Sequence, residues 1–293
     1  MAFRRISFTH IGVAAALAAG SVTLCNKRCT ANAAPNQRSS SPSSNRILAP
    51  QGWTQERIEA ELLAPQEAQK LTVYHEKKVL SYEEIEKIMM FEASQRMLLG
   101  KTQRDAEGFK KMDATWYTTY LQTNRAFQSA FPEIVERLIT TARRADQAQN
   151  WGILSVEDED VRVRVIELHR VRPGGALPDT RHLDRGSLIT IDAMLSDASG
   201  FLGGVFSTLE ENGLQQPHEF TKGDVVVFPS HKYHCVQPVE NGERVVLVME
   251  LWRGEERDCA HRCMQYLGDC GFSVASSMAE ILFTSALPEV DPW

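Results

Sequence analysis

The spacing of hydrophobic and polar residues changes near residue 161 and divides the chain into a helical part and a strand-rich part. Before this point, Ser81-Tyr82-Glu83-Glu84 has the form of a capping box, and Ile85, Ile88 and Met89 follow it at helical spacing. A second helix is predicted from Pro132, because proline is favourable in a first turn. We therefore expect a helical support region over residues 53–150 whose apolar stripes cover a sheet.

After residue 161 the pattern has a period of two. Val161, Val163 and Val165 alternate with the two arginines between them, which predicts a strand. Many short strands at near-regular spacing are typical of a β-sandwich or jelly roll. We therefore expect an α+β protein whose strand-rich core spans residues 151–252. Further strands, separated by glycine-containing turn signals, are predicted over 188–195, 205–209, 225–228, 235–239 and 245–252.

The composition is that of a globular protein, and the net charge argues against one class of partner. The 293 residues are 43% hydrophobic and 24% charged, unlike a disordered chain or a polytopic membrane protein. The formal net charge is −6 and the isoelectric point is near 5.8, so nucleic acid is not expected as a partner. The sequence contains no phosphate-binding loop, nucleophile elbow or dinucleotide fingerprint, which excludes the common kinase, hydrolase and dehydrogenase patterns.

The first 55 residues differ from the rest, since they hold six basic and no acidic side chains. An apolar run over 11–25 follows two arginines, and Ala31-Asn32-Ala33 has the form of a cleavage site. We expect a signal or targeting peptide over 1–33, a Ser/Pro-rich linker over 34–52, and location in the secretory pathway (the endoplasmic reticulum or beyond). Import into a plastid or mitochondrion, or retention of the leader as an anchor, are the alternatives. The apolar run is shorter than the ~20 residues of a transmembrane helix, so no stable membrane span is expected after processing.

Three residues of the strand-rich part have the chemistry of a metal site. His182 and Asp184 are separated by one residue, so both can face one side of an extended chain. Taken alone, this pair is better explained by a surface His–Asp hydrogen bond than by a metal site. His234 follows later, and Arg244 lies ten residues beyond it, on the next predicted strand. Two imidazoles and one carboxylate form the facial triad of non-haem Fe(II) oxygenases, and a guanidinium can grip a carboxylate at two points.

In these motifs the sequence resembles the 2-oxoglutarate/Fe(II)-dependent dioxygenases, particularly their prolyl 4-hydroxylase-like branch. The similarity spans residues 161–252, about a third of the chain. It is carried by four elements in the family's order: His182-x-Asp184, Leu195-Ser196-Asp197 leading to Gly203-Gly204, Gly223-Asp224 leading to Phe228-Pro229, and His234 through Pro238-Val239 to Gly242-x-Arg244.

The resemblance implies a double-stranded β-helix (jelly roll) core flanked by N-terminal helices, and a dioxygenase (hydroxylase) activity. It implies that Fe(II) is bound by His182, Asp184 and His234, with no catalytic residue beyond these ligands. Arg244 would hold the far carboxylate of the co-substrate 2-oxoglutarate, together with the hydroxyl of Thr190, and ascorbate would keep the iron reduced. The remaining partners are O2 and a peptide or small-molecule substrate, which is hydroxylated as succinate and CO2 are released.

The sequence also departs from the prolyl hydroxylase branch. Val171 and Met194 stand where that branch commonly has tyrosines, and Arg244 replaces a common lysine. The segment 175–182 is interpreted as a loop that is longer than usual. The substrate is therefore left open between a protein side chain and a small metabolite. Two other functions remain as alternatives: a cupin-like metal enzyme that does not use 2-oxoglutarate, and a non-catalytic jelly-roll binding module.

The C-terminal tail, residues 253–293, contains three of the cysteines. Cys235, Cys259, Cys263 and Cys270 remain once the leader is removed, an even number that suits an oxidising compartment. A disulfide clip among the last three is one interpretation, reduced thiols are a second, and zinc bound together with the intervening His261 is a third. Cys259-x-x-x-Cys263 is a single cysteine pair, whereas a structural zinc site normally has two such pairs or one pair with two histidines.

Overall fold

The computed structural model describes residues 54–98, 115–154 and 161–270. All of them belong to one unit, Arg46–Trp293. The predicted targeting peptide, the predicted linker and the end of the tail (residues 271–293) lie outside the described residues. Within the described ranges, no helix combines the length and apolar character needed to cross a membrane.

The two helices predicted individually from the sequence begin where expected. Glu84 donates its backbone N–H to Ser81 Oγ at 3.2 Å, and the Ser81 N–H donates to Glu84 Oε2 at 2.8 Å, so the predicted capping box is confirmed. The helix predicted from Pro132 ends at Asn150, which adopts a left-handed conformation. The helices are α1 (Gln55–Ala68), α2 (Tyr82–Leu98), α3 (Ala126–Ala130) and α4 (Pro132–Gln149), with 3₁₀ turns η1 (Thr123–Arg125) and η2 (Ala198–Gly200).

The strands form two larger antiparallel sheets. The major sheet has the order β1–β9–β5–β12–β3–β2, the minor sheet has the order β4–β10–β7–β8, and β6 pairs with β11 separately. The strands are β1 (Tyr74–Glu76), β2 (Trp116–Tyr120), β3 (Arg162–Val171), β4 (Leu177–His182), β5 (Ile189–Met194), β6 (Phe201–Gly203), β7 (Phe206–Leu209), β8 (Gln215–His218), β9 (Val225–Pro229), β10 (His234–Val236), β11 (Val239–Gly242) and β12 (Arg244–Trp252).

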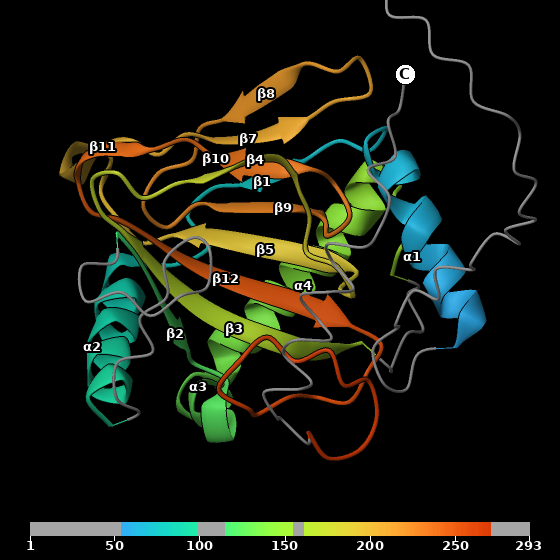
Figure 1. Cartoon of the computed structure of the whole chain (residues 1–293). Helices are drawn as coiled ribbons and strands as arrows, with labels where there is room; N and C mark the ends of the chain where they lie inside the picture. The colour runs from blue at the N-terminus through green and yellow to red at the C-terminus, as the bar shows by residue number, and fades with distance from the viewer. Residues whose placement is uncertain (1–53, 99–114, 155–160, 271–293) are drawn as a thin grey trace, which may run out of the picture. The chain divides into compact units, whose positions relative to one another are not determined.

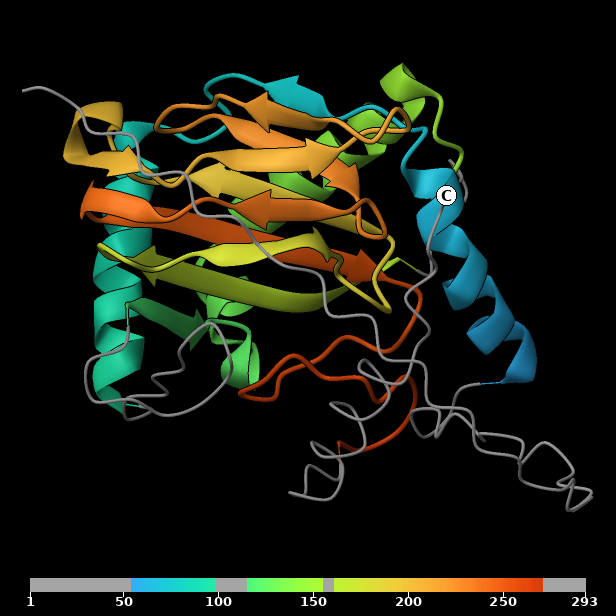
Figure 2. The ribbon, with the colours of Figure 1, turned by 45° about the horizontal axis from the view of Figure 1, so that its top comes forward.

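The connections between these strands define the fold. From β3 to β12 the chain passes repeatedly from one sheet to the other: β3, β5, β9 and β12 lie in the major sheet, and β4, β7, β8 and β10 lie in the minor sheet (Figures 1 and 2). This alternation is the connectivity of a double-stranded β-helix. The predicted α+β fold, with a jelly-roll core flanked by N-terminal helices, is confirmed.

The major sheet is buried on both of its faces. Residues of one parity, such as Leu247 on β12 and Ile191 on β5, join the helices in the largest hydrophobic cluster. Figure 1 shows α4 behind this sheet, and Ile134 and Leu138 of α4 belong to the same cluster. Residues of the other parity, such as Val246, face the minor sheet and the cavity between the sheets. The helices therefore support the sheet from behind and leave its inner face for other groups.

Three strands lie where the sequence pattern predicts something else. The region expected to be helical, 53–150, also contributes β1 and β2, the two edge strands of the major sheet. The segment interpreted as a long loop, 175–182, contains β4, which pairs with β10. Four successive residues of β4 are exposed, so it lacks the hydrophobic alternation by which a half-buried strand is found, and backbone pairing with its neighbour stabilises it instead.

The described part of the tail, residues 253–270, is irregular, and Figure 2 shows it running below the strands, on the β3 side of the major sheet. The backbone N–H of Asn124 donates to Asp258 O at 2.7 Å, which attaches the tail to η1. None of the cysteines at 235, 259, 263 and 270 is in a disulfide, so the disulfide clip is not what the structure shows.

Candidate metal centre and its cavity

The minor sheet brings the three predicted metal-binding residues together. His182 ends β4 and His234 begins β10, and the two residues are direct partners in the pairing of these strands. Asp184 follows two residues after His182, where its backbone N–H donates to Ser230 O at 2.8 Å. One ligand atom from each of the three side chains lies within 4.8 Å of the other two. The local spacing and the strand register together produce a facial arrangement of two imidazoles and a carboxylate.

Hydrogen bonds orient these ligand atoms. His234 Nδ1 lies 3.0 Å from Lys232 O, and because a carbonyl oxygen only accepts, Nδ1 carries the proton and Nε2 presents its lone pair. That Nε2 is 3.7 Å from Asp184 Oδ2, and His182 Nε2 is 3.5 Å from Asp184 Oδ1. The hydroxyl of Thr190 donates to Asp184 Oδ2 at 2.7 Å. Both imidazoles therefore face a carboxylate whose orientation is fixed by the hydrogen bond from Thr190.

The protonation states also suit a divalent metal. Burial opposes ionisation of Asp184, but the neighbouring groups, Arg262 foremost, outweigh it and hold the pKa of this carboxyl well below its usual value. Burial lowers the pKa of His234 to about 4, which keeps its ring neutral. A carboxylate and a neutral imidazole are the forms that bind metal ions.

Arg262 reaches this centre from the C-terminal tail, which the sequence analysis did not predict. Its Nη1 donates to Asp184 Oδ1 at 3.0 Å, its Nε is 3.5 Å from Glu167 Oε1, and its Nη2 contacts Glu250 Oε1. Glu167 and Glu250 are themselves buried on β3 and β12. A charged residue inside an apolar run of β12 was the available signal for Glu250. Glu167 stands on a strand that also contains three arginines, so it gave no comparable signal. The irregular tail gave no such signal for Arg262.

The two buried acids respond differently to this arginine. Burial opposes ionisation of Glu167, but Arg262 and His169 outweigh it and lower its pKa to about 2. For Glu250 burial prevails over the arginines and raises its pKa to about 7. Glu250 is also hydrogen-bonded by Ser187 Oγ at 2.6 Å. The carboxylates around Asp184 are thus held by one shared guanidinium.

Arg244 occupies the opposite end of the inner face of β12. It is 2% exposed, yet its Nε and Nη2 have no hydrogen-bond partner among the described residues. Burial lowers its pKa to about 10, although Asp192 partly opposes this. The side chain passes Gly204, where a Cβ would lie 2.8 Å from Arg244 Cδ, so glycine at 204 provides the space for it. An unsatisfied buried guanidinium is costly unless a ligand completes its hydrogen bonds.

Thr190 does not lie where the resemblance implies. It was expected beside Arg244, but it pairs with Glu250, six residues further along β12, and its hydroxyl bonds Asp184. It therefore orients the carboxylate of the metal centre. The buried polar group on β5 that interacts with Arg244 is Asp192, whose pKa is raised to about 7 by burial. Asp192 stands on the inward-facing parity of an apolar strand, and this pattern would have identified it.

One cavity is lined both by the metal-binding cluster and by Arg244. Its volume is about 330 Å³, within the size range of small-molecule sites, and it lies between the two sheets. Val246 and Val248 of β12 form an apolar surface between the metal centre and Arg244. His231, three residues before His234, points away from the cavity, and its Nε2 lies 2.6 Å from Oε2 of Glu61 on α1. The lining consists of Trp116, Thr118, Tyr120, Glu167, His169, Ala176, Leu177, His182, Asp184, Asp192, Phe206, His234, Val236, Arg244, Val246, Val248 and Arg262.

Comparisons with known proteins find similar structures and no similar sequence. No family model matches the chain, and no curated protein does. An oxidoreductase of the 2OG-Fe(II) oxygenase family from Burkholderia pseudomallei is 15% identical, with 68% of this chain and 92% of that chain covered and a TM-score of 0.45. A Pseudomonas putida prolyl-4-hydroxylase is 16% identical (67% and 100% covered, TM-score 0.42). HygX from Streptomyces hygroscopicus, with nickel and 2-oxoglutarate bound, is 12% identical (73% and 96% covered, TM-score 0.44).

Proposed function

We propose that the chain is an Fe(II)- and 2-oxoglutarate-dependent dioxygenase that hydroxylates a protein side chain or a small metabolite. The observation that carries this proposal is the cavity, in which a cluster of two imidazoles and one carboxylate and an unsatisfied guanidinium stand at opposite ends of an apolar floor. A divalent metal fits the first group, and the carboxylate of a dicarboxylic acid fits the second.

The metal ligands would be His182, Asp184 and His234. Three protein ligands on one face leave positions open for a chelating co-substrate and for O2. Each oxygen of Asp184 already accepts one hydrogen bond, from Thr190 and from Arg262, which fixes the carboxylate plane. The ligands themselves are mostly buried, which limits the access of bulk water.

Arg244 would bind the far carboxylate of 2-oxoglutarate. Its two unsatisfied N–H groups would complete their hydrogen bonds with that carboxylate, and Val246 and Val248 would contact the methylene carbons. When bound, iron and 2-oxoglutarate would supply the oxidising chemistry: one atom of O2 would enter succinate as CO2 is lost, and the other would enter a C–H bond of the substrate. The protein contributes position and exclusion of water.

The substrate would enter between the edge strands β2 and β4. Trp116 of β2 and Leu177 of β4 line the cavity from the two sheets, and His169 lies beside them. Trp116 Nε1 donates to His169 Nδ1 at 2.8 Å, so this side of the cavity is ordered. An apolar entrance with an aromatic side chain suits either a peptide side chain or a small metabolite.

The test is succinate release by purified protein with Fe(II), 2-oxoglutarate and ascorbate, over a panel of peptides and metabolites. We expect release that needs both iron and 2-oxoglutarate, and a substrate product heavier by one oxygen atom in mass spectrometry. His234→Ala should abolish release, while His231→Ala, the matched histidine that turns away from the centre, should keep it. Metal-dependent turnover without 2-oxoglutarate would favour a cupin-like enzyme. Absence of 2-oxoglutarate binding to iron-loaded protein would favour a non-catalytic module.

The proposal also covers the cellular location of the chain and the reductant of its iron. We infer from the sequence of residues 1–33 that the chain enters the secretory pathway, and from the family resemblance that ascorbate supports the iron. Expression of the full chain in a eukaryotic host tests the first point, because N-terminal sequencing of the recovered protein should begin after residue 33. Turnover measured with and without ascorbate tests the second.

A further inference from the structure

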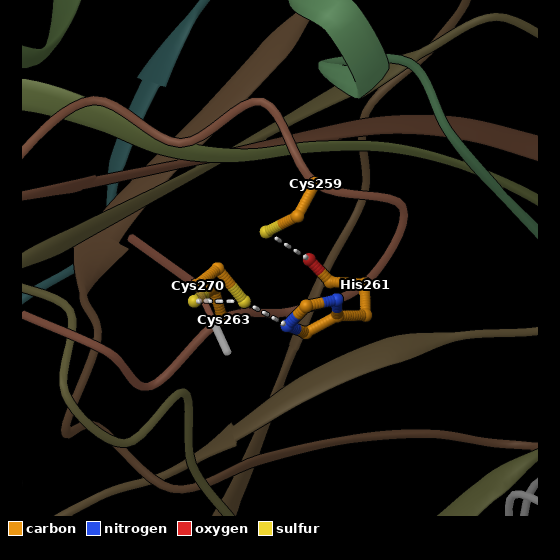
Figure 3. A group of neighbouring side chains, drawn as sticks. All are labelled: Cys259, His261, Cys263 and Cys270. Atoms are coloured by element: carbon orange, nitrogen blue, oxygen red, sulfur yellow. Dashed lines mark hydrogen bonds between the residues drawn. The ribbon is translucent and has the colours of Figure 1, made fainter. Parts of the chain in front are cut away.

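A second cluster of metal-binding side chains lies in the C-terminal tail, outside the cavity. Figure 3 shows Cys259, His261, Cys263 and Cys270 turned toward one another. One ligand atom from each side chain lies within 4.8 Å of every other. Cys270 Sγ is 3.3 Å from His261 Nε2 and 3.5 Å from Cys263 Sγ. The four ligand atoms are therefore close enough together to share one ion.

These separations fit a single tetrahedral ion. With zinc–sulfur bonds of ~2.3 Å and a zinc–nitrogen bond of ~2.0 Å, tetrahedral angles place two sulfurs about 3.8 Å apart and a sulfur and a nitrogen about 3.5 Å apart. Three sulfurs and one imidazole, without an oxygen ligand, favour zinc over magnesium, calcium or manganese. A closed set of four protein ligands is the arrangement of a structural site.

The core holds the backbone of three of these residues in place. Gln122 is fully buried, and its Nε2 donates to Cys259 O at 2.9 Å and to His261 O at 3.2 Å. Arg164, also fully buried, donates from Nε to Cys263 O at 2.9 Å. Two buried polar side chains are thus used to position a segment that has no regular secondary structure. Such outer contacts are typical of metal sites, whose ligands need a fixed orientation.

The spacing of the residues explains why the usual sequence pattern is absent. Cys259, His261 and Cys263 are alternate residues and point to one side of the segment, toward Cys270. Arg262, between two of them, points to the other side and bonds Asp184. This alternation replaces the two-residue spacing of a zinc knuckle, so the sequence left zinc as one of three interpretations, and the structure brings the four side chains together.

We propose that Cys259, His261, Cys263 and Cys270 bind one structural zinc ion. The ion cross-links residues 259–270 of the tail and thereby fixes the segment that carries Arg262. The proposal concerns the tail alone and does not depend on the proposed oxygenase reaction. A disulfide between Cys263 and Cys270 is the competing state, and it would leave Cys259 and His261 without a common ligand.

Zinc content of the full chain is the first test. The double variant His182→Ala/His234→Ala removes two ligands of the cavity centre and so isolates the tail site. After equilibration with zinc chloride and removal of loose metal by a weak chelator, this double variant should retain one zinc per chain. Cys263→Ser added to the double variant should lose that zinc, whereas Cys235→Ser, at a matched buried cysteine on β10, should not. Retention with Cys263→Ser, or no zinc in the double variant itself, would overturn the proposal.

Cobalt spectroscopy tests the site without any variant. Freshly reduced wild-type protein titrated with cobalt chloride should develop a thiolate-to-cobalt charge-transfer band and visible bands of tetrahedral intensity, and zinc should displace both. The cavity centre contains no sulfur and cannot give the charge-transfer band. If no such band develops, or if mass spectrometry of the zinc-equilibrated chain shows a Cys263–Cys270 disulfide, the proposal is wrong.

Discussion

Replacement of Arg244 by methionine tests whether this arginine binds a ligand or stabilises the fold. The substitution keeps most of the aliphatic stem and removes the guanidinium. A net hydrogen bond to a charged group is worth about 1.5–3 kcal/mol, so the two unsatisfied N–H groups should contribute about 3–6 kcal/mol to binding of 2-oxoglutarate. Because ~1.4 kcal/mol is tenfold in affinity, the KM and Kd for 2-oxoglutarate should rise by about 10²–10⁴-fold.

The same substitution should stabilise the protein when 2-oxoglutarate is absent. Burial lowers the pKa of Arg244 from 12.5 to about 10, and a lowering of this size corresponds to about 3 kcal/mol of unfavourable charge burial at neutral pH. Loss of that cost should raise the Tm by about 5 °C or more for a domain of this size. An arginine that held the fold together would give the opposite sign.

Thermal unfolding with and without 2-oxoglutarate measures both effects in one assay. Arg244→Met should begin at a higher Tm than wild type and show no further shift on addition of 2-oxoglutarate. Arg172→Met is the matched control, because Arg172 is exposed and pairs with Glu243 at 2.9 Å, so both quantities should stay near the wild-type values. A lower Tm in Arg244→Met together with an unchanged KM would refute the assigned role.

Three further predictions concern the charged groups of the cavity. Asp184→Ala removes the anionic ligand and should abolish iron-dependent turnover, measured as succinate release alongside iron content. Asp192, with a pKa raised to about 7 by burial, is neutral below that pH and ionised above it, where it competes for Arg244. The KM for 2-oxoglutarate should therefore rise between pH 6 and pH 8 by at most about tenfold per pH unit, and Asp192→Asn should flatten the profile. Arg262→Met leaves Asp184 and two other buried carboxylates without their shared cation, so thermal or urea unfolding should show a loss of about 3 kcal/mol; an unchanged stability would contradict the described contacts.

The fold was predictable where the hydrophobic pattern is regular. β5, β9 and β12 are runs of buried residues bounded by turn signals, and the sequence places them within one residue of their observed ends. The alternation from Val161 predicts where β3 begins, but not that it continues to Val171. β4 and β8 could not be found in this way. Leu177–His182 and Gln215–His218 are polar, mostly exposed and contain proline, so their conformation depends on pairing with strands far away in the chain.

The residues of the candidate site fall into the same two groups: those found from nearby sequence, and those whose position depends on contacts far away in the chain. His182 and Asp184 belong to one short motif, and His234 and Arg244 follow at the spacing of the family that the sequence resembles, so this resemblance in local motifs selected them. Thr190 was placed near the wrong group, because its partner depends on the register between β5 and β12. Arg262 enters from an irregular segment whose path is fixed by Gln122 and Arg164, and no local pattern encodes that path.

The burial of β12 on both faces has a consequence for changing the specificity of this protein. Leu247 and Met249 pack toward the helices, whereas Val246 and Val248 line the cavity, so a substitution on either face disturbs the other through one shared backbone. The exposed strand β4 carries no such constraint. Directed evolution of substrate scope should therefore tolerate libraries at residues 178–181 and fail at the strand that carries Arg244, whichever molecule is being selected.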